Sequence, residues 1–169
     1  YNRIANEMKK IFFDNKKLKG ILVGGPIPTK DEFLDGNYLV TKLREKVIGI
    51  VDIGDADESG LKELVKKSED ILANQEIIKE KKILENFFEK LGENPEIVVY
   101  DEKGIRKAIE YGAVETLILS KKLNKNILKE LKKLAENISS KVEVVSTETE
   151  EGEQFYNLSG IGALLRFKI

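Results

Sequence analysis

The strongest constraint on this chain is an alternation of short apolar runs with longer stretches of helical periodicity. The short runs are rich in β-branched residues and bounded by Gly or polar residues, as buried strands are. They occupy residues 20–24, 46–52, 97–100, 116–120, 142–146 and 161–167. Between them, apolar residues recur at the spacing of one helix face. The alternation predicts an α/β fold in which helices are layered on sheets.

Two helical stripes meet near residue 73 and suggest a domain boundary there. The first stripe ends at Leu72 and the next begins at Ile77, so little chain remains between them. We therefore expect two small α/β domains, residues 1–73 and 74–169, joined at or inside a helix rather than by a flexible linker. A helical stripe is also already running directly after Tyr1, which suggests a fragment of a longer chain.

The residue types present narrow the chemistry that is open to the chain. Its 169 residues include no His and no Cys, which excludes Ser-His-Asp and Cys-His nucleophilic systems and Cys/His zinc sites. The formal net charge is −1, so no overall field draws the chain onto nucleic acid. No apolar run approaches the roughly 20 residues of a membrane span, and a cytoplasmic protein is expected. We expect no cofactor and no metal.

Three acids after the second expected strand make the best case for enzyme chemistry. Asp52, Asp55 and Asp57 follow the carboxyl end of that strand, where ligands bind in open α/β sheets, and their oxygens could hold Mg²⁺ for phosphoryl chemistry. The alternative, which we favour, is a solvated loop whose acids suit the positive N-terminus of the next helix.

A basic helix in the second half is a candidate RNA contact. Lys125, Lys129 and Lys132 lie outside the apolar stripe of their helix and are expected to face outward. Each phosphate that such a face neutralises adds salt-dependent affinity, so ribosomal RNA is one candidate partner. A face that is merely solvated is the alternative.

The helix expected over residues 76–91 has an unusually wide apolar face. Its core stripe comprises Ile77, Leu84, Phe88 and Leu91. Ile83 and Phe87 lie roughly 60° to 100° from the centre of that stripe, which places them at the edge of solvent. They form either a binding hot spot or a broad core contact, and the periodicity leaves both open.

Three segments resemble one known family, in the family's own order. The first is GGPIPTKDEFLDGNYLVTKLREKVIGIVDIGDADESGLKELV, from Gly24 to Val65. The second is ILANQEIIKEKKILENFFEKLG together with GIRKAIEYGAVETLIL, and the third is STETEEGEQFYNLSGIGALLRF, from Ser146 to Phe167. They resemble the middle domain, the start of the last domain and the C-terminal signature of archaeal and eukaryotic class-one peptide chain release factors.

The resemblance implies the fold and the limits of the activity. The first domain would have a ribonuclease-H-like topology, present here in part, and the second would resemble small ribosomal RNA-binding proteins. In the family, one domain reads the stop codon and a Gly-Gly-Gln loop drives peptidyl-tRNA hydrolysis. This sequence contains no Gly-Gly-Gln, and Gly24-Gly25-Pro26 is not that loop. Residues 1–73 would be the part of the middle domain downstream of it, and the chain would be non-catalytic.

The resemblance also implies partners. They are an elongation-factor-like translational GTPase, an ABC-type recycling ATPase, the ribosome with its ribosomal RNA and, for the full-length protein, peptidyl-tRNA. In the family, the GTPase docks on the helix that matches residues 76–91 and on the segment before the final strand. The corresponding residues here are Ile83, Leu84, Phe87, Phe155 and Leu158.

Two alternative functions stay open beside the release factor. Pelota, the ribosome-rescue relative, shares both domains and lacks Gly-Gly-Gln throughout, although the turn over residues 29–38 looks more like a release factor. A Mg²⁺-dependent phosphohydrolase built on Asp52, Asp55 and Asp57 is the alternative from another class.

Overall fold

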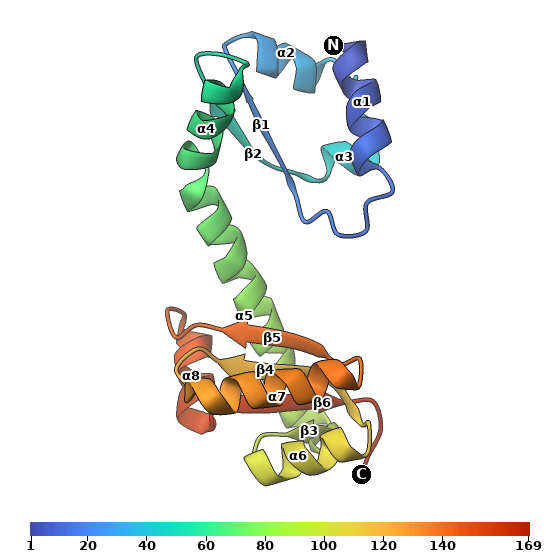
Figure 1. The fold of residues 1–169 in the computed structure, drawn as a ribbon, viewed down its shortest axis with the longest axis vertical. Helices are drawn as coiled ribbons and strands as arrows, with labels where there is room; N and C mark the ends of the chain where they lie inside the picture. Colours follow the sequence, from blue (N-terminus) through green and yellow to red (C-terminus); the bar gives the residue numbers. More distant parts are fainter. The chain divides into compact units, whose positions relative to one another are not determined.

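Two parallel strands form the centre of the first of two units into which the chain divides. The computed structural model describes residues 1–169, and the units are Tyr1–Gln75 and Glu76–Ile169 (Figure 1). The elements of the first unit are α1 (Asn2–Phe12), β1 (Ile21–Gly25), α2 (Thr29–Asp35), α3 (Thr41–Arg44), β2 (Val47–Asp52) and α4 (Glu58–Lys67). Strand β1 pairs with β2 from Ile21 opposite Val47 to Gly25 opposite Asp52.

The core of the first unit lies where α1 and α2 pack together. Ala5 of α1 and Phe33 and Leu34 of α2 are buried there, with Leu39 from the following loop. Val23 of β1 packs against them, as do Met8 of α1 and Tyr38 from the loop after α2. The polar loop after β2 ends at Asp57, where Asp57 Oδ1 accepts a hydrogen bond from the Gly60 N–H at 2.9 Å. This side-chain cap fixes the start of α4.

A long helix, α5 (Glu69–Glu93), begins in the first unit and ends in the second. The boundary expected near residue 73 falls inside this helix. No helix of the chain combines the length and the apolar character that crossing a bilayer requires.

The second unit has a sheet of its own, with four strands in the order β3-β6-β4-β5. Its elements after α5 are a short 3-10 turn (Pro95–Ile97), β3 (Val98–Val99), α6 (Glu102–Glu110), β4 (Val114–Ser120), α7 (Lys125–Asn137), β5 (Lys141–Val145), α8 (Glu150–Leu158) and β6 (Ile161–Leu165). Strands β4 and β5 are parallel, whereas β6 runs antiparallel to both β3 and β4.

Both faces of this sheet are covered by helices, so the second unit has two cores. On one face, Ile105 and Ile109 of α6 and Leu131 of α7 pack against β4 and β6. On the other face, Leu84 and Phe87 of α5 and Phe155 of α8 surround Ile118 and Leu164. The expectation of an α/β chain is confirmed, while the finer topologies implied by the family resemblance remain predictions.

Candidate functional site

The expected partner-binding residues divide into a fully buried set and a partly accessible set. Leu84, Phe87 and Phe155 have no exposed surface and belong to one buried cluster. Within it, the rings of Phe87 and Phe155 meet edge to face with centroids 5.3 Å apart. Gly162 of β6 lies directly beneath, so close that a Cβ there would come within 2.6 Å of the Phe87 ring. The expectation that Phe87 lies at the edge of solvent is therefore wrong. Helix α8 covers that side of α5, which the periodicity of α5 alone does not show.

The other two residues, Ile83 and Leu158, keep part of their surface accessible, and we call them the docking face. Leu158 ends α8 and is 40% exposed, while Ile83 is half-buried on α5. Each lies about one helical turn from the contact between Phe87 and Phe155. The docking face therefore rests on a rigid aromatic core that does not itself reach the surface.

A buried carboxylate anchors the same helix to the sheet. Glu80 of α5 is 2% exposed and accepts a hydrogen bond from Ser146 Oγ at 2.7 Å. Lys121 Nζ lies 3.8 Å from its other oxygen. Ser146 directly follows β5 and Lys121 directly follows β4, so Glu80 holds α5 at the carboxyl ends of two parallel strands. No local pattern pointed to this role of Glu80, because the residue stands in a run of charged residues.

The three lysines of α7 all lie on its solvent face. Lys125, Lys129 and Lys132 are exposed and form no ion pair in the structure. The buried residues of α7 are Leu131 and Ala135. A basic face is therefore available, as the sequence predicted, although its contact with RNA remains a prediction.

One acid of α7 is neutralised by a neighbouring helix. Glu130 accepts a hydrogen bond from Arg106 of α6 at 2.8 Å, and Arg106 also donates to Glu102 at 2.8 Å. The hydrogen bond from Arg106 lowers the pKa of Glu130. In return, the hydrogen bonds to Glu130 and Glu102 raise the pKa of Arg106. Because Arg106 engages Glu130 in this way, Glu130 forms no ion pair with the α7 lysines.

Two of the three aspartates considered for Mg²⁺ serve other contacts. Asp52 Oδ1 forms an ion pair with Lys30 Nζ at 2.6 Å, and Asp57 caps α4. Lys30 is 7% exposed and also pairs with Asp31 at 2.8 Å. The hydrogen bonds to Asp31 and then to Asp52 raise the pKa of Lys30. No group of His, Cys, Asp or Glu in the chain is arranged to hold a metal ion. The geometry favours the interpretation of a capping loop over a phosphohydrolase centre.

Two family models cover almost the whole chain. The model described as eRF1 domain 2 matches residues 1–74, and that described as eRF1 domain 3 matches residues 77–169. The chain belongs to the eRF1 family of class-one peptide chain release factors, which acts in translation termination and ribosome rescue.

A curated relative shows how much of a longer family member this chain covers. The peptide chain release factor subunit 1 of Thermococcus onnurineus (strain NA1) is 38% identical over 217 residues, which are 99% of this chain and 52% of that protein. The chain thus spans about half the length of the curated relatives it matches. The matched stretch of 217 residues exceeds the 169 residues here, so the relative carries additional residues within it.

Two solved structures are similar in fold. The crystal structure of an archaeal translation termination factor, aRF1, has a TM-score of 0.52 and 30% identity, covering 98% of this chain and 49% of that one. A model of ribosome-bound archaeal Pelota and ABCE1 gives a TM-score of 0.75 and 27% identity, covering 99% of this chain and 48% of that one.

Proposed function

We propose that this chain is the partner-binding part of a release factor that directs peptidyl-tRNA hydrolysis at stop codons. The second unit binds an elongation-factor-like translational GTPase or an ABC-type recycling ATPase, and the first unit supports the catalytic loop. The observation that carries this proposal is the match of residues 1–74 and 77–169 to eRF1 domains 2 and 3, in that order. The chain itself supplies no Gly-Gly-Gln, so its contribution is binding and support.

The docking face is our proposed site for the GTPase. Leu158 is exposed at the end of α8, and Ile83, half-buried on α5, packs against the core that holds Phe87 and Phe155. Apolar side chains held on a rigid support lose little conformational entropy on binding, which is a property of hot spots. The buried residues Leu84, Phe87 and Phe155 support this face from below and would not touch a partner.

Leu158→Asp tests this site. We expect the variant to bind the GTPase about thirtyfold more weakly, since losing a hot spot typically costs about 2 kcal/mol or more. The measurement is isothermal titration calorimetry of the 169-residue chain with the GTPase and, separately, with the ATPase. Tyr111→Asp is the matched control, because Tyr111 is 61% exposed but follows α6 on the opposite face of the sheet.

The control and a melting curve make the outcome decisive. Unchanged affinity in a folded Leu158→Asp variant would move the interface elsewhere. An equal loss in Tyr111→Asp would assign the effect to added charge rather than to a lost contact.

A Pelota-like rescue function is the second candidate. It is supported by the higher TM-score to ribosome-bound Pelota, 0.75 against 0.52 for aRF1. The release factor is favoured by sequence, at 38% identity to a release factor against 27% to that Pelota. Hydrolysis that depends on a stop codon, measured with the whole protein, supports the release factor. Activity on ribosomes stalled without a stop codon supports rescue.

A further inference from the structure

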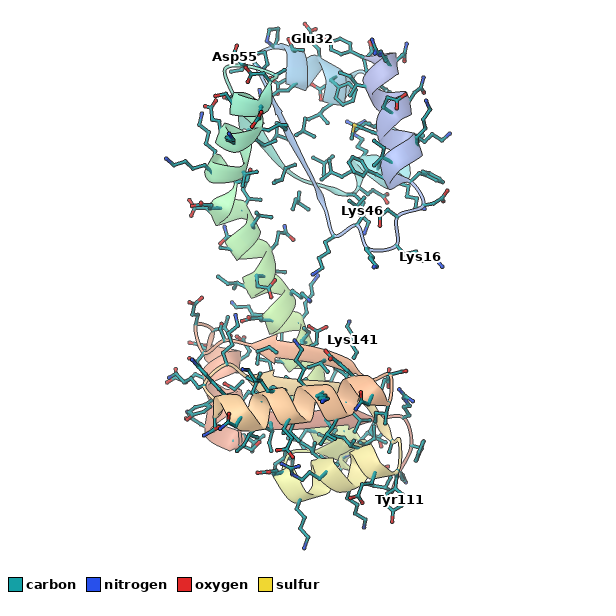
Figure 2. All side chains as sticks on the ribbon, in the orientation of Figure 1. Lys16, Glu32, Lys46, Asp55, Tyr111 and Lys141 are labelled. Carbon is teal, nitrogen blue, oxygen red and sulfur yellow. The ribbon has the colours of Figure 1, made fainter.

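In the first unit, positive and negative side chains gather at opposite ends of the two strands. Because β1 and β2 are parallel, their N-terminal ends lie at one edge of the sheet and their C-terminal ends at the other. The residues just before the two strands include six cations: Lys16, Lys17, Lys19, Lys42, Arg44 and Lys46. We call these six the basic end. Figure 2 shows Lys16 and Lys46 at one end of this unit, and Glu32 and Asp55 at the other.

The charge of the basic end is not neutralised within the chain. All six side chains are exposed, and none forms one of the ion pairs of this unit. Arg44 donates to the neutral Asn37 Oδ1 at 2.9 Å, and Lys42 to the carbonyl oxygen of Phe13 at 2.7 Å. Two acids, Asp14 and Glu45, stand in the same two segments, which leaves an excess of positive charge. The lysine at the other end, Lys30, is paired with two aspartates.

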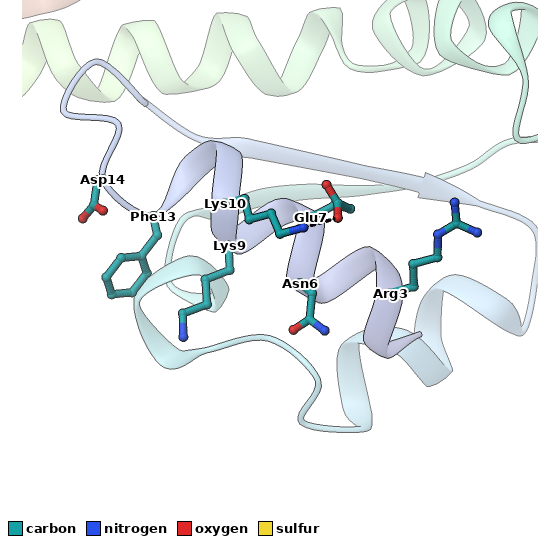
Figure 3. A pocket seen from close by; sticks show the side chains of 7 residues that line it. All are labelled: Arg3, Asn6, Glu7, Lys9, Lys10, Phe13 and Asp14. Atoms are coloured by element: carbon teal, nitrogen blue, oxygen red, sulfur yellow. Dashed lines mark hydrogen bonds and ion pairs between the residues drawn. The ribbon is translucent and has the colours of Figure 1, made fainter.

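Contacts between α3 and the end of α1 hold part of the basic end in place. Lys42 Nζ lies 4.2 Å from the centroid of the Phe13 ring and so ties α3 to the end of α1. A cavity of about 220 Å³ lies between the loop after α1 and α3, with Lys16, Lys42 and Lys46 at its walls. On the outer face of α1, Lys9 extends beside Phe13, whereas Lys10 is directed to Glu7 (Figure 3). Lys9 thus adds a further unpaired cation next to the basic end.

We propose that the basic end binds the phosphate backbone of RNA, as a surface distinct from the α7 lysines. The inference rests on the proposed function, since a factor that works on the ribosome is surrounded by RNA. Five of the six cations are lysines, a residue type that is depleted at protein–protein interfaces. Lysines bind phosphates as point charges, and contacts to phosphates carry no information about the base sequence. The binding is therefore independent of sequence and strongly dependent on salt.

The test compares charge reversals at two places in the same unit. The probe is a fluorescein-labelled double-stranded RNA hairpin, with binding followed by anisotropy across a salt series. The test variant is Lys16→Glu/Lys17→Glu/Lys19→Glu. It leaves Lys42 unchanged, because Lys42 donates a structural hydrogen bond to the carbonyl oxygen of Phe13. The control, Arg3→Glu/Lys62→Glu/Lys66→Glu, makes the same change in net charge at exposed positions of α1 and α4.

We expect the test variant to bind at least about tenfold more weakly at low salt. The slope of log affinity against log salt should fall by about 2 to 3, because each lost phosphate contact removes nearly one unit. The control should keep most of the slope, and binding of the test variant to the GTPase should be unchanged. That last readout separates failure of this proposal from failure of the proposed function.

Three results would overturn the proposal. The first is an unchanged affinity and slope in the test variant. The second is an equal loss in the control, which would assign binding to net charge alone. The third is displacement of the RNA by poly-glutamate at equal charge concentration, which would identify an acidic protein segment as the occupant.

Discussion

Phe87 and Leu158 show how one residue's role depends on what packs beside it. Helical periodicity placed Phe87 at the margin of the α5 stripe, yet α8 and Gly162 of β6 cover it completely. Leu158 lies only three residues after the buried Phe155 and keeps 40% of its surface exposed. Local spacing identified both as apolar residues of interest, but only tertiary packing decides which of them a partner could reach.

Phe87→Asp should unfold the second unit rather than disturb a surface. It places a carboxylate where an aromatic ring is fully buried, and we expect a loss of at least about 3 kcal/mol in the free energy of unfolding. Urea denaturation followed by circular dichroism measures the loss. Leu158→Asp should change stability by less than about 1 kcal/mol, as exposed substitutions usually do. Equal stability of the two variants would contradict the burial of Phe87.

At the scale of elements, the sequence predicted the alternation of strands and helices well. All six apolar runs became strands, with ends shifted by a few residues. They could be recognised because β-branched runs bounded by turn residues form a local signal. The strand order β3-β6-β4-β5 could not be found this way, because pairing between distant strands leaves no local pattern. The buried Glu80 was missed for a similar reason, since its partner Ser146 is 66 residues away.

The pairing of α6 with α7 predicts a pH dependence of stability. Arg106 lowers the pKa of Glu130 below its ordinary value of 4.5. The pair therefore contributes stability above about pH 4.5, and that contribution is lost as the pH falls through the lower folded-state value. Glu130→Gln should flatten this acid-side loss in unfolding curves recorded across that window. Glu136→Gln, at an exposed position of the same helix without an ion pair, should behave as wild type. A steep loss retained in Glu130→Gln would contradict the assignment.

The basic face of α7 gives a second prediction for an element. Lys125→Glu/Lys129→Glu/Lys132→Glu should reduce the salt-sensitive binding of the chain to ribosomes without unfolding it, because the three lysines avoid the buried face. Cosedimentation with ribosomes across a salt series measures this. The control is Lys81→Glu/Lys82→Glu/Lys103→Glu, at exposed positions of α5 and α6. If both variants sediment like wild type, the α7 lysines only solubilise the chain.

At the scale of the whole molecule, two units with separate sheets follow each other along the chain, and each matches one eRF1 domain. The family could be predicted because the C-terminal signature and the segment from Gly24 to Val65 are long and specific. The distribution of charge in the first unit could not be predicted, because its six cations come from two segments that only the parallel pairing of β1 and β2 brings together.

Our central proposal is that this chain binds the partner of a release factor and does not release peptide itself. The most direct measurement is peptide release from stop-programmed ribosomes by a full-length archaeal relative and its GTPase, with increasing amounts of the 169-residue chain. We predict background release with the chain alone. Excess chain should slow the release that depends on the GTPase, and the Leu158→Asp variant should slow it far less. Release above background with the chain alone, or equal slowing by the chain and the variant, would contradict this account.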